Sequence, residues 1–346
     1  MEPIVGMVLC AGLGTRLRPL TARLPKPAVP VCGLPLVRYA LALLAGAGAR
    51  RAVVNVHHLP DAMAAAARAS AGALGLDLAV SREPVIAGTG GALREARAAL
   101  SGAAAVVVVN GDVLFDVDLA AAVRAHGASG ALATMVLMRM PAGGGYAAVE
   151  TDRTGAVRRI AGRFGPGGEG LTPWHFTGVH VLAPELLARV PAEPFELDVN
   201  RHVYPPLMDA GLVRGHVVES AWDDLGTPAR YLAANEDVLS GRFPLARFHG
   251  ASPFAGHEPS GHPGVWLGPG AQVDPSAVLH APALVGPGAR IEAGATVGPS
   301  AVVGAGARVG AGARVAHAVV WEGTDVRPRE ELLRAVAAGQ ERVTAA

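Results

Sequence analysis

An aliphatic residue recurs every six positions through the C-terminal part of the chain. The series is Leu267, Val273, Leu279, Val285, Ile291, Val297, Val303, Val309 and Val315, and an alanine stands four places after each of the first eight. A period of six matches neither the roughly 3.6-residue repeat of an α-helix nor the alternation of a β-strand. A glycine-alanine linker does not hold one aliphatic residue in register for so long. We therefore expect a repeat structure.

The six-residue period resembles the hexapeptide repeat of a left-handed parallel β-helix. Each coil of such a solenoid is a triangle of three short strands, with aliphatic and small side chains stacked inward. Glycine and proline at the intervening positions, as in Gly286-Pro287-Gly288, suit the corners. The series predicts about three coils over residues 263–326. Residues 327–342 have helical periodicity, so we expect a C-terminal helix and tail over residues 327–346 that cap the solenoid.

Residues 4–240 alternate short β-branched runs with alanine- and leucine-rich runs. The β-branched runs predict buried strands at 4–9, 52–56, 76–80 and 105–109, with helices between them. Apolar strands separated by helices indicate an α/β fold with a Rossmann-like, mostly parallel sheet. We expect this domain over residues 1–240 and a linker over 241–262. The ligand site should lie beyond the carboxyl ends of the strands.

Composition argues against several classes of protein. The net charge is +1 without a long basic run, so we expect no nucleic-acid partner. No apolar stretch reaches the roughly 18 residues of a membrane-spanning helix, and the first residues do not resemble a secretion signal. We expect no membrane association and a cytoplasmic location. Cys10 and Cys32 are too few for a disulfide scaffold or a four-ligand zinc site. The expected partners are small molecules.

Of the 30 basic residues, Lys26 alone is a lysine. An ammonium is a compact charge and a guanidinium a wide planar fork, so a site crowded around a phosphate can require lysine. Lys26 lies in Pro25-Lys26-Pro27, after the glycine-rich string Gly12-Leu13-Gly14-Thr15-Arg16. Glycines let the backbone approach phosphate oxygens. The string lacks the Gly-Lys-Ser/Thr of a Walker loop and the third glycine of a dinucleotide-binding loop.

Four further strings lie at predicted turns and strand ends. They are Gly88-Thr89-Gly90-Gly91, Asn110-Gly111-Asp112, Phe176-Thr177-Gly178-Val179 and Trp222-Asp223-Asp224-Leu225-Gly226-Thr227-Pro228. With the glycine-rich string and Pro25-Lys26-Pro27, they resemble the motifs of the sugar-phosphate nucleotidyltransferase family over residues 4–240. The resemblance implies an enzyme that joins a nucleoside triphosphate and a sugar 1-phosphate, releases pyrophosphate and uses Mg²⁺.

The same resemblance implies roles for single residues. Catalysis would fall to Arg16, Lys26 and Asp112, and Mg²⁺ binding to Asp112 and Asp224, with Asp223 as the alternative to Asp224. Nucleotide contacts would come from Leu9, Ala11, Gly12, Gly14, Thr15, Glu83, Gly88, Thr89 and Gly90, and sugar contacts from Tyr146, Glu150, Thr177 and Gly178. Chemistry agrees, because in-line attack on the α-phosphorus needs positioning and neutralised charge, and Mg²⁺ prefers hard oxygen ligands.

The base and the sugar leave alternatives open. Glu83-Pro84 resembles guanylyltransferases, and a carboxylate at Glu83 can accept two hydrogen bonds from guanine. We therefore expect GTP and mannose 1-phosphate, or a related hexose or heptose phosphate. The alternative is uridylyl transfer to N-acetylmuramate 1-phosphate or a hexose 1-phosphate, because a lysine that many relatives place near the sugar phosphate is missing. Arg163 stands in that stretch and would have to replace it.

Two rival interpretations concern the whole chain. A regulatory subunit without catalysis would be expected to lose one of the four charged site residues, and all of them are present: Arg16, Lys26, Asp112 and Asp224. The β-helix as an acyltransferase would need more coils and an insertion that binds the acceptor. We expect it to serve assembly into a homo-oligomer through its flat faces.

Overall fold

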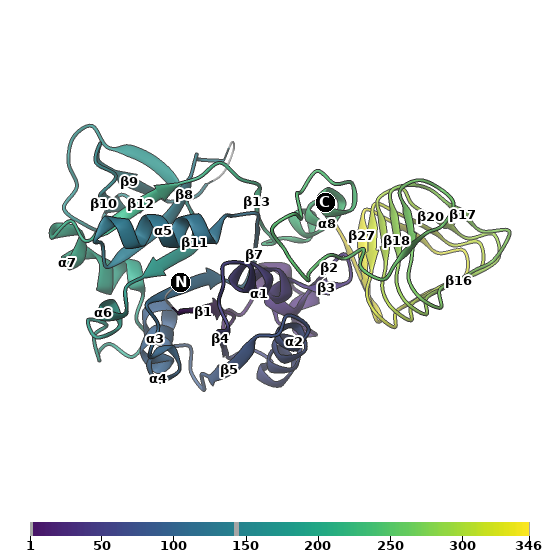
Figure 1. Cartoon of the computed structure of the whole chain (residues 1–346). Helices are drawn as coiled ribbons and strands as arrows, with labels where there is room; N and C mark the ends of the chain where they lie inside the picture. The colour runs from purple at the N-terminus through teal and green to yellow at the C-terminus, as the bar shows by residue number, and fades with distance from the viewer. Residues whose placement is uncertain (1–2, 142–144, 346) are drawn as a thin grey trace. The chain divides into compact units, whose positions relative to one another are not determined.

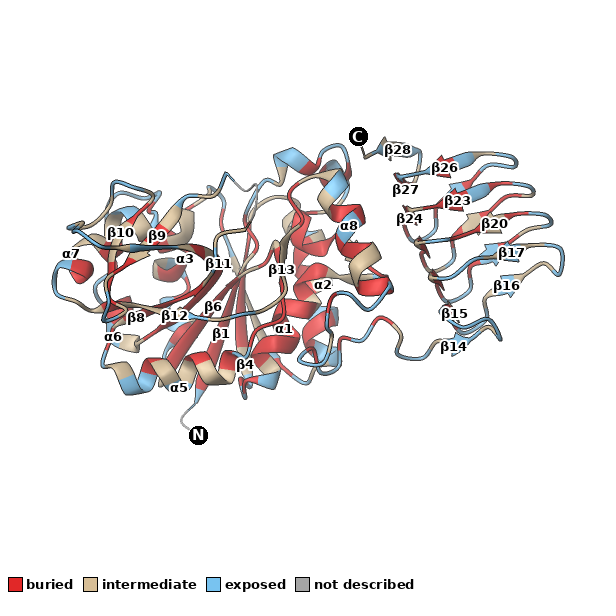
Figure 2. Cartoon of the chain, turned by 90° about the horizontal axis from the view of Figure 1, so that it is seen from above, coloured by how far each residue is buried: buried red, intermediate tan, exposed pale blue. Residues whose placement is uncertain are grey.

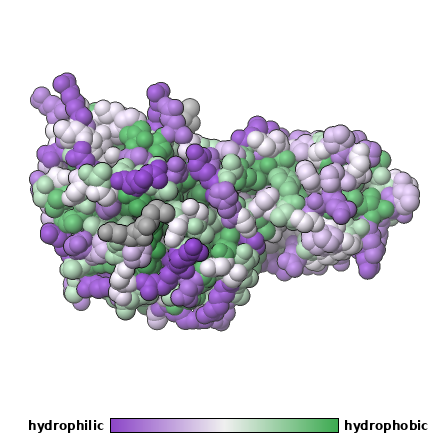
Figure 3. Space-filling view, in the orientation of Figure 1, coloured by the Kyte–Doolittle hydropathy of each residue, from purple (hydrophilic) through white to green (hydrophobic). Residues whose placement is uncertain are grey.

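The computed structural model describes residues 3–141 and 145–345, which form two compact units. Unit 1 holds the described residues up to Leu13 and those from Val37 to Trp222, and unit 2 holds Gly14–Leu36 and the chain from Asp223 onwards. The division passes through the expected 1–240 domain, because Gly14–Leu36 packs with the C-terminal part. No described helix is both long and apolar enough to cross a bilayer. Hydrophilic and hydrophobic residues are interspersed on the face drawn in Figure 3.

A nine-stranded sheet forms the centre of unit 1 (Figure 1). Its parallel part is, in spatial order, β6 (Ala105–Asn110), β1 (Ile4–Leu9), β4 (Arg51–Val56) and β5 (Asp77–Arg82). In the antiparallel part, β11 (Thr172–Leu182) pairs with β6, β9 (Ala148–Thr151) pairs with β11, and β10 (Val157–Ile160) pairs with β9. β8 (Ala133–Met138) also pairs with β11, and β12 (Val213–Val217) runs parallel to β8. The expected α/β fold is confirmed, with antiparallel strands added on one side.

Helices cover this sheet because apolar strands need cover on both faces. They are α1 (Leu36–Gly46), α2 (Pro60–Ala73), α3 (Gly88–Glu95), α4 (Arg97–Leu100), α5 (Leu119–Ser129), α6 (Pro184–Leu187) and α7 (Tyr204–Asp209), and the short strand β7 is Val113–Phe115. Figure 2 shows the central strands β1 and β6 buried. The chain passes from β1 to β4 and β5 and then crosses to β6, so the strand order reverses at β1. Such a reversal opens a crevice beyond the strand ends.

Unit 2 starts from a short N-terminal segment, Gly14–Leu36. The segment contains the turns η1 (Thr15–Leu17), η2 (Leu20–Ala22) and η3 (Lys26–Ala28) and the hairpin of β2 (Pro30–Val31) and β3 (Leu34–Pro35). Later in the chain, β13 (Trp222–Asp224) leads into α8 (Pro228–Leu239), whose N-cap is Thr227. α8 contacts β2 and two strands of the C-terminal solenoid, β24 and β27.

The C-terminal strands stack in three parallel sheets. The first contains β15 (Val265–Leu267), β18 (Ala283–Val285), β21 (Ala301–Val303), β24 (Ala318–Val320) and β27 (Ala335–Ala338). The second contains β16 (Gln272–Val273), β19 (Arg290–Ile291), β22 (Arg308–Val309) and β25 (Asp325–Val326), and the third contains β17 (Val278–Leu279), β20 (Thr296–Val297), β23 (Arg314–Ala316) and β26 (Glu331–Leu333). Val285 pairs with Val303, so one coil takes 18 residues, or three hexapeptides. The predicted parallel β-helix is confirmed, and its hand stays a prediction.

The predicted C-terminal helix is wrong. Residues 331–344 form β26, β27 and β28 (Glu341–Thr344), and β28 pairs antiparallel with β27 and covers the edge of the first sheet. The other edge is covered by β14 (Glu258–Pro259). The buried aliphatic series continues at Val320, Val326 and Leu332, but the step from Val315 to Val320 is one residue short of six. Because the period is broken at this step, the sequence predicted about three coils, whereas the structure has a fourth.

Candidate functional site

The carboxyl ends of β1 and β6 lie side by side, with Leu9 opposite Asn110. The Gly111 amide donates to the Leu9 carbonyl at 2.9 Å, and a Cβ on Gly111 would lie 2.7 Å from Sγ of Cys10. This close approach requires glycine and brings Asp112 beside the start of the glycine-rich string. Of the predicted residues, Leu9, Ala11 and Asp112 therefore lie together, and Gly12 follows in an exposed position with open space around its Cα.

Glu83 follows β5 and is buried, with 6% of its surface exposed. Nδ2 of Asn55 donates to Oε1 of Glu83 at 2.8 Å, and the Ala87 amide donates to Oε2 at 3.0 Å. Oδ1 of Asn55 accepts from the Cys10 amide at 2.7 Å. These bonds connect the ends of β1, β4 and β5. Both oxygens that we expected to bind guanine are thus used inside unit 1.

Cys10 itself is buried beneath this network, as Cys32 is in unit 2. Burial raises the pKa of both thiols well above the usual range, and for Cys10 the nearby Asp112 adds to the effect. A thiol is a weak nucleophile and metal ligand compared with the thiolate. We therefore assign neither cysteine a chemical role.

The turn Gly88-Thr89-Gly90 packs against Leu197. A Cβ on Gly88, which has φ of +74°, would lie 2.7 Å from the Leu197 carbonyl oxygen. The Gly90 amide donates to that oxygen at 2.7 Å, and Oγ1 of Thr89 accepts from the Val199 amide at 3.0 Å. The glycines permit this close packing. Two of the groups expected to meet the nucleotide therefore bind the chain itself.

Gly178 lies at an irregularity in the pairing of β11 with β8 and has φ of +87°. A Cβ there would lie 2.9 Å from the Asn110 side chain, so this predicted sugar contact is beside the end of β6. Thr177 is fully buried, and its hydroxyl donates to the Val136 carbonyl at 2.8 Å. The Gly178 backbone therefore lies beside the end of β6, whereas the Thr177 side chain is hydrogen-bonded in the core.

Tyr146, His175 and Trp222 form an aromatic cluster in unit 1. The ring centroid of His175 lies 4.5 Å from that of Tyr146 and 4.4 Å from that of Trp222. Nε1 of Trp222 donates to the Thr177 carbonyl at 2.9 Å, which fixes the indole beside the predicted sugar contacts Thr177 and Gly178. The predicted sugar contact Tyr146 therefore lies close to Trp222, the first residue of β13.

Glu150, the fourth predicted sugar contact, is engaged by an arginine on the neighbouring strand. Nη2 of Arg159 donates to Oε1 of Glu150 at 2.8 Å. This hydrogen bond lowers the pKa of the Glu150 carboxyl, against the effect of burial. Arg163, expected as the substitute for the missing lysine, is exposed, and its guanidinium lies 5.2 Å above the Phe164 ring. Its substitution for lysine stays a prediction.

Unit 2 gathers the predicted phosphate-binding residues of the N-terminal segment. Gly14 has φ of +59°, and a Cβ there would lie 3.1 Å from Cβ of Lys26, so the turn folds onto the lysine. Lys26 is buried, with 6% exposed, whereas Thr15 and Arg16 are exposed. A Cβ on Gly226 would lie 3.3 Å from the Arg16 guanidinium. Arg16 therefore lies over the loop that follows β13.

Two neighbouring carboxylates end β13. Asp224 forms an ion pair with Arg230 on α8, and the Asp224 side chain is 13% exposed. Burial raises the pKa of the Asp223 carboxyl to about 6, while the Arg230 charge opposes this rise. The Asp224 carboxylate therefore already holds a cationic group, and a metal ion would have to displace or share it.

Mg²⁺ binding by Asp112 of unit 1 and Asp224 of unit 2 stays a prediction, and each side chain is of a type that suits this ion. Asp112 and Asp224 offer only oxygen ligands, which Mg²⁺ prefers, and it is usually held by one or two carboxylates plus substrate phosphates. Among the described residues, no three His, Cys, Asp or Glu side chains gather as a metal cage.

Three residues of the site were not assigned a role from the sequence: Asn55, Trp222 and Arg230. Asn55 is the last residue but one of β4, so the rule that strand ends carry the site could have found it. Trp222 was part of a motif but had no expected role. The role of Arg230 could not be recognised from the sequence, because an arginine in the first turn of a helix is usually a solvated surface residue.

Comparison with known proteins adds to this geometry. Residues 5–241 match the nucleotidyl transferase family model, and residues 282–320 match the model of bacterial transferase hexapeptide (six repeats). The chain is 32% identical to the mannose-1-phosphate guanylyltransferase of Mycobacterium tuberculosis over 77% of this chain and 72% of the relative. It is 31% identical to the UTP-glucose-1-phosphate uridylyltransferase of Synechocystis sp. over 68% of this chain and 63% of that protein.

A further relative covers the nucleotidyl transferase part almost completely. The N-acetylmuramate alpha-1-phosphate uridylyltransferase of Caulobacter vibrioides is 38% identical over 67% of this chain and 96% of its own length. The family model spans most of the residues from β1 to α8, which contain every strand end described above. The chain belongs to the nucleotidyl transferase family and carries C-terminal hexapeptide repeats.

Proposed function

We propose that the chain transfers a nucleotidyl group from a nucleoside triphosphate to a sugar 1-phosphate. A phosphate oxygen of the sugar phosphate attacks the α-phosphorus, the bond between the α-phosphorus and the bridging oxygen breaks, and pyrophosphate leaves. The observation that carries this proposal is the turn of Gly14, which folds onto the buried Lys26 while Arg16 lies over the loop after β13. Glycine backbone, one ammonium and one guanidinium are the groups that bind a triphosphate.

Each charged residue then has a separate task. Arg16, as an exposed bidentate donor, would bind the β- and γ-phosphates, and Lys26 would bind where the two substrates' phosphates meet. Asp112 and Asp224 would hold Mg²⁺, which when bound neutralises charge on the phosphate oxygens. Arg230 would leave or share Asp224 when the metal binds, because both need the same carboxylate.

GTP and mannose 1-phosphate are the proposed substrates. The name of the Mycobacterium tuberculosis relative supports this pair, since the match extends over 77% of this chain. A Drosophila pseudoobscura protein named as the catalytic subunit beta of a mannose-1-phosphate guanylyltransferase is 27% identical over 65% of this chain. Because both oxygens of Glu83 already accept a hydrogen bond within the chain, guanine recognition would need other groups as well.

UTP is the second candidate, and the state of Glu83 favours it. Guanine presents adjacent N–H donors that call for a carboxylate, and both oxygens of Glu83 already accept hydrogen bonds from Asn55 and Ala87. Uracil has no adjacent pair of N–H donors on its pairing edge, so its recognition does not require a carboxylate. The Caulobacter vibrioides relative, which is named a uridylyltransferase, is 38% identical to this chain, against 32% for the Mycobacterium tuberculosis guanylyltransferase.

The test is pyrophosphate release by the purified chain with each of the four common NTPs and a panel of sugar 1-phosphates in the presence of Mg²⁺. GTP with mannose 1-phosphate should give the highest kcat/KM. A higher value with UTP would replace guanylyl by uridylyl transfer. Background release with every pair, together with retained nucleotide-sugar binding, would make the chain a silent regulatory subunit.

A further inference from the structure

A chain of two hydrogen bonds, one buried and one partly buried, connects the β-helix to the phosphate-binding segment within unit 2. Nε1 of Trp321 donates to the Tyr231 hydroxyl oxygen at 3.0 Å, and that hydroxyl donates to the Pro30 carbonyl at 2.5 Å. Tyr231 is fully buried and Trp321 is 6% exposed. Trp321 follows β24, Tyr231 lies on α8, and Pro30 begins β2, so three parts of the chain meet at one hydroxyl.

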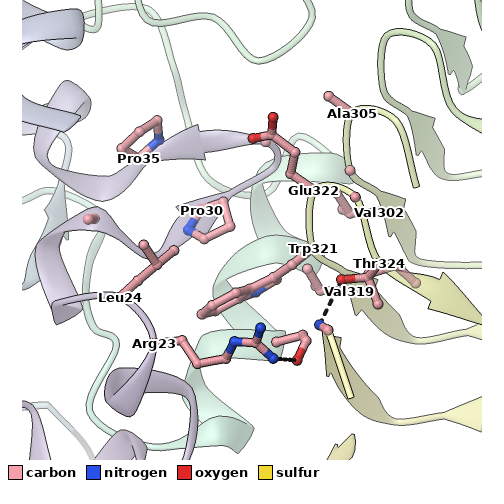
Figure 4. A pocket seen from close by; sticks show the side chains of 17 residues that line it. Arg23, Leu24, Pro30, Pro35, Val302, Ala305, Val319, Trp321, Glu322 and Thr324 are labelled. Carbon is pink, nitrogen blue, oxygen red and sulfur yellow. Dashed lines mark hydrogen bonds between the residues drawn. The ribbon is translucent and has the colours of Figure 1, made fainter. Parts of the chain in front are cut away.

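The same segment has two further ties to unit 2. Oδ1 of Asn235, one helical turn after Tyr231, accepts from the Cys32 amide at 2.7 Å, and Nη1 of Arg23 donates to the Ala338 carbonyl at 2.7 Å. Figure 4 shows the Trp321 indole between Pro30 and Arg23. A cavity of about 480 Å³ lies beside these ties, and its lining includes Arg23, Pro30 and Trp321. The hydrogen bonds therefore act together with packing, since Val29 and Val31 are fully buried, to set the segment's position.

The position of Pro30 determines that of Lys26 through short steps. The Val29 amide donates to the Lys26 carbonyl at 3.1 Å, and the Leu36 amide donates to the Val29 carbonyl at 3.1 Å. Lys26 is thus held four residues from the carbonyl that Tyr231 binds. A partly buried carbonyl that loses its donor is destabilised where it lies, which favours another arrangement of this short segment.

We propose that Tyr231 and Trp321 are positioning residues, through which the β-helix holds the Gly14–Leu36 segment in its nucleotide-binding form. The β-helix is then part of the catalytic apparatus and more than an assembly module. The proposal rests on the proposed function for its kinetic consequence. Its structural consequence, the ordering of the segment, does not depend on any activity.

The test compares Tyr231→Phe with Tyr204→Phe. Tyr204 is also fully buried, and its hydroxyl bonds to Nδ1 of His180 at 2.7 Å in unit 1, without a tie to the segment. Tyr231→Phe removes both hydrogen bonds of the hydroxyl, and it should raise the nucleotide KM about tenfold or more, with a smaller change in the sugar 1-phosphate KM. Tyr204→Phe should leave the nucleotide KM unchanged. Trp321→Phe, which removes the N–H donor and part of the buried indole but keeps an aromatic ring, should act in the direction of Tyr231→Phe.

Hydrogen exchange of the full-length chain supplies the readout that needs no turnover. The Val29 and Leu36 amides should exchange at least several times faster in Tyr231→Phe than in the parent chain, and not in Tyr204→Phe. Equal exchange in all three proteins, or equal loss of nucleotide affinity in both tyrosine variants, would overturn the proposal. A parent chain inactive with every substrate pair would sink the proposed function alone. The exchange result would still decide this inference.

Discussion

Glu83 holds two parts of unit 1 at once, because its two oxygens accept from Asn55 and from the Ala87 amide. Glu83→Gln would place an amide donor against one of these donors in a buried site. We expect the free energy of unfolding to fall by about 1–3 kcal/mol, measured by urea denaturation. Glu95→Gln is the control, since Glu95 pairs only with Arg94 and is 47% exposed. Unchanged stability with a raised KM for GTP would return Glu83 to base recognition.

His180 should make unit 1 sensitive to acid. Burial lowers the pKa of this histidine to about 3 in the folded chain, against an ordinary value of 6.5. The unfolded chain therefore takes up a proton that the folded chain refuses, so stability is complete above about pH 6.5 and is lost as the pH falls towards 3. Urea unfolding at pH 7 and pH 5 should differ by about 2 kcal/mol more in the parent than in His180→Gln. Identical pH dependence of the two proteins would contradict this.

Residue roles could be predicted where strand order and local motif agree. Asp112 follows a buried strand, and β1 and β6 are neighbours, so its place at the sheet edge follows from topology. The use of Glu83 and Arg230 could not be predicted, because their partners Asn55 and Asp224 are selected by side-chain geometry in the folded chain. The local sequence around a glutamate next to a glycine turn is the same whether its carboxylate binds a nucleotide base or a backbone amide of the chain.

The β-helix is the element that the sequence predicts best. Inward positions repeat with a fixed spacing, so period and coil size follow directly from the pattern. The prediction failed where Val315 is followed by Val320 after five residues, because the strict period then assigns the next aliphatic residues to the wrong face. The amphipathic appearance of residues 327–342 came from this shifted repeat and not from a helix.

Val297 and Val278 allow a matched test of which face is inside. Val297 on β20 is fully buried between coils, whereas Val278 on the adjacent β17 is 47% exposed. Val297→Ala should lower the free energy of unfolding by roughly 1–3 kcal/mol through lost burial and a cavity. Val278→Ala should change it by less than about 0.5 kcal/mol. Denaturant unfolding followed by circular dichroism measures both, and equal effects would mean that the assigned inward face is wrong.

At the scale of the whole molecule, the compact units do not follow the order of the chain. Gly14–Leu36 belongs to unit 2 with the β-helix, while the strands before and after it belong to unit 1. Sequence periodicity reports local burial and cannot reveal a contact such as that of Trp321 with Tyr231, 90 residues apart. Each unit contributes part of the predicted charge set: Asp112 lies in unit 1, and Arg16, Lys26 and Asp224 lie in unit 2.

A double-mutant cycle tests whether Asp112 and Asp224 serve one metal ion. If they share Mg²⁺, either Asp112→Asn or Asp224→Asn removes most of its effect, and each should lower kcat/KM by roughly a hundredfold or more. The double variant should then be no more than about tenfold worse than the poorer single variant, because residues that act as a unit are strongly non-additive. Mg²⁺ titration of each protein should show the same weakened metal dependence, and the melting temperature of Asp112→Asn should be close to the parent's. Fully multiplicative losses would mean that the two carboxylates act independently, and a larger effect from Asp223→Asn than from Asp224→Asn would move the second ligand one residue back along β13.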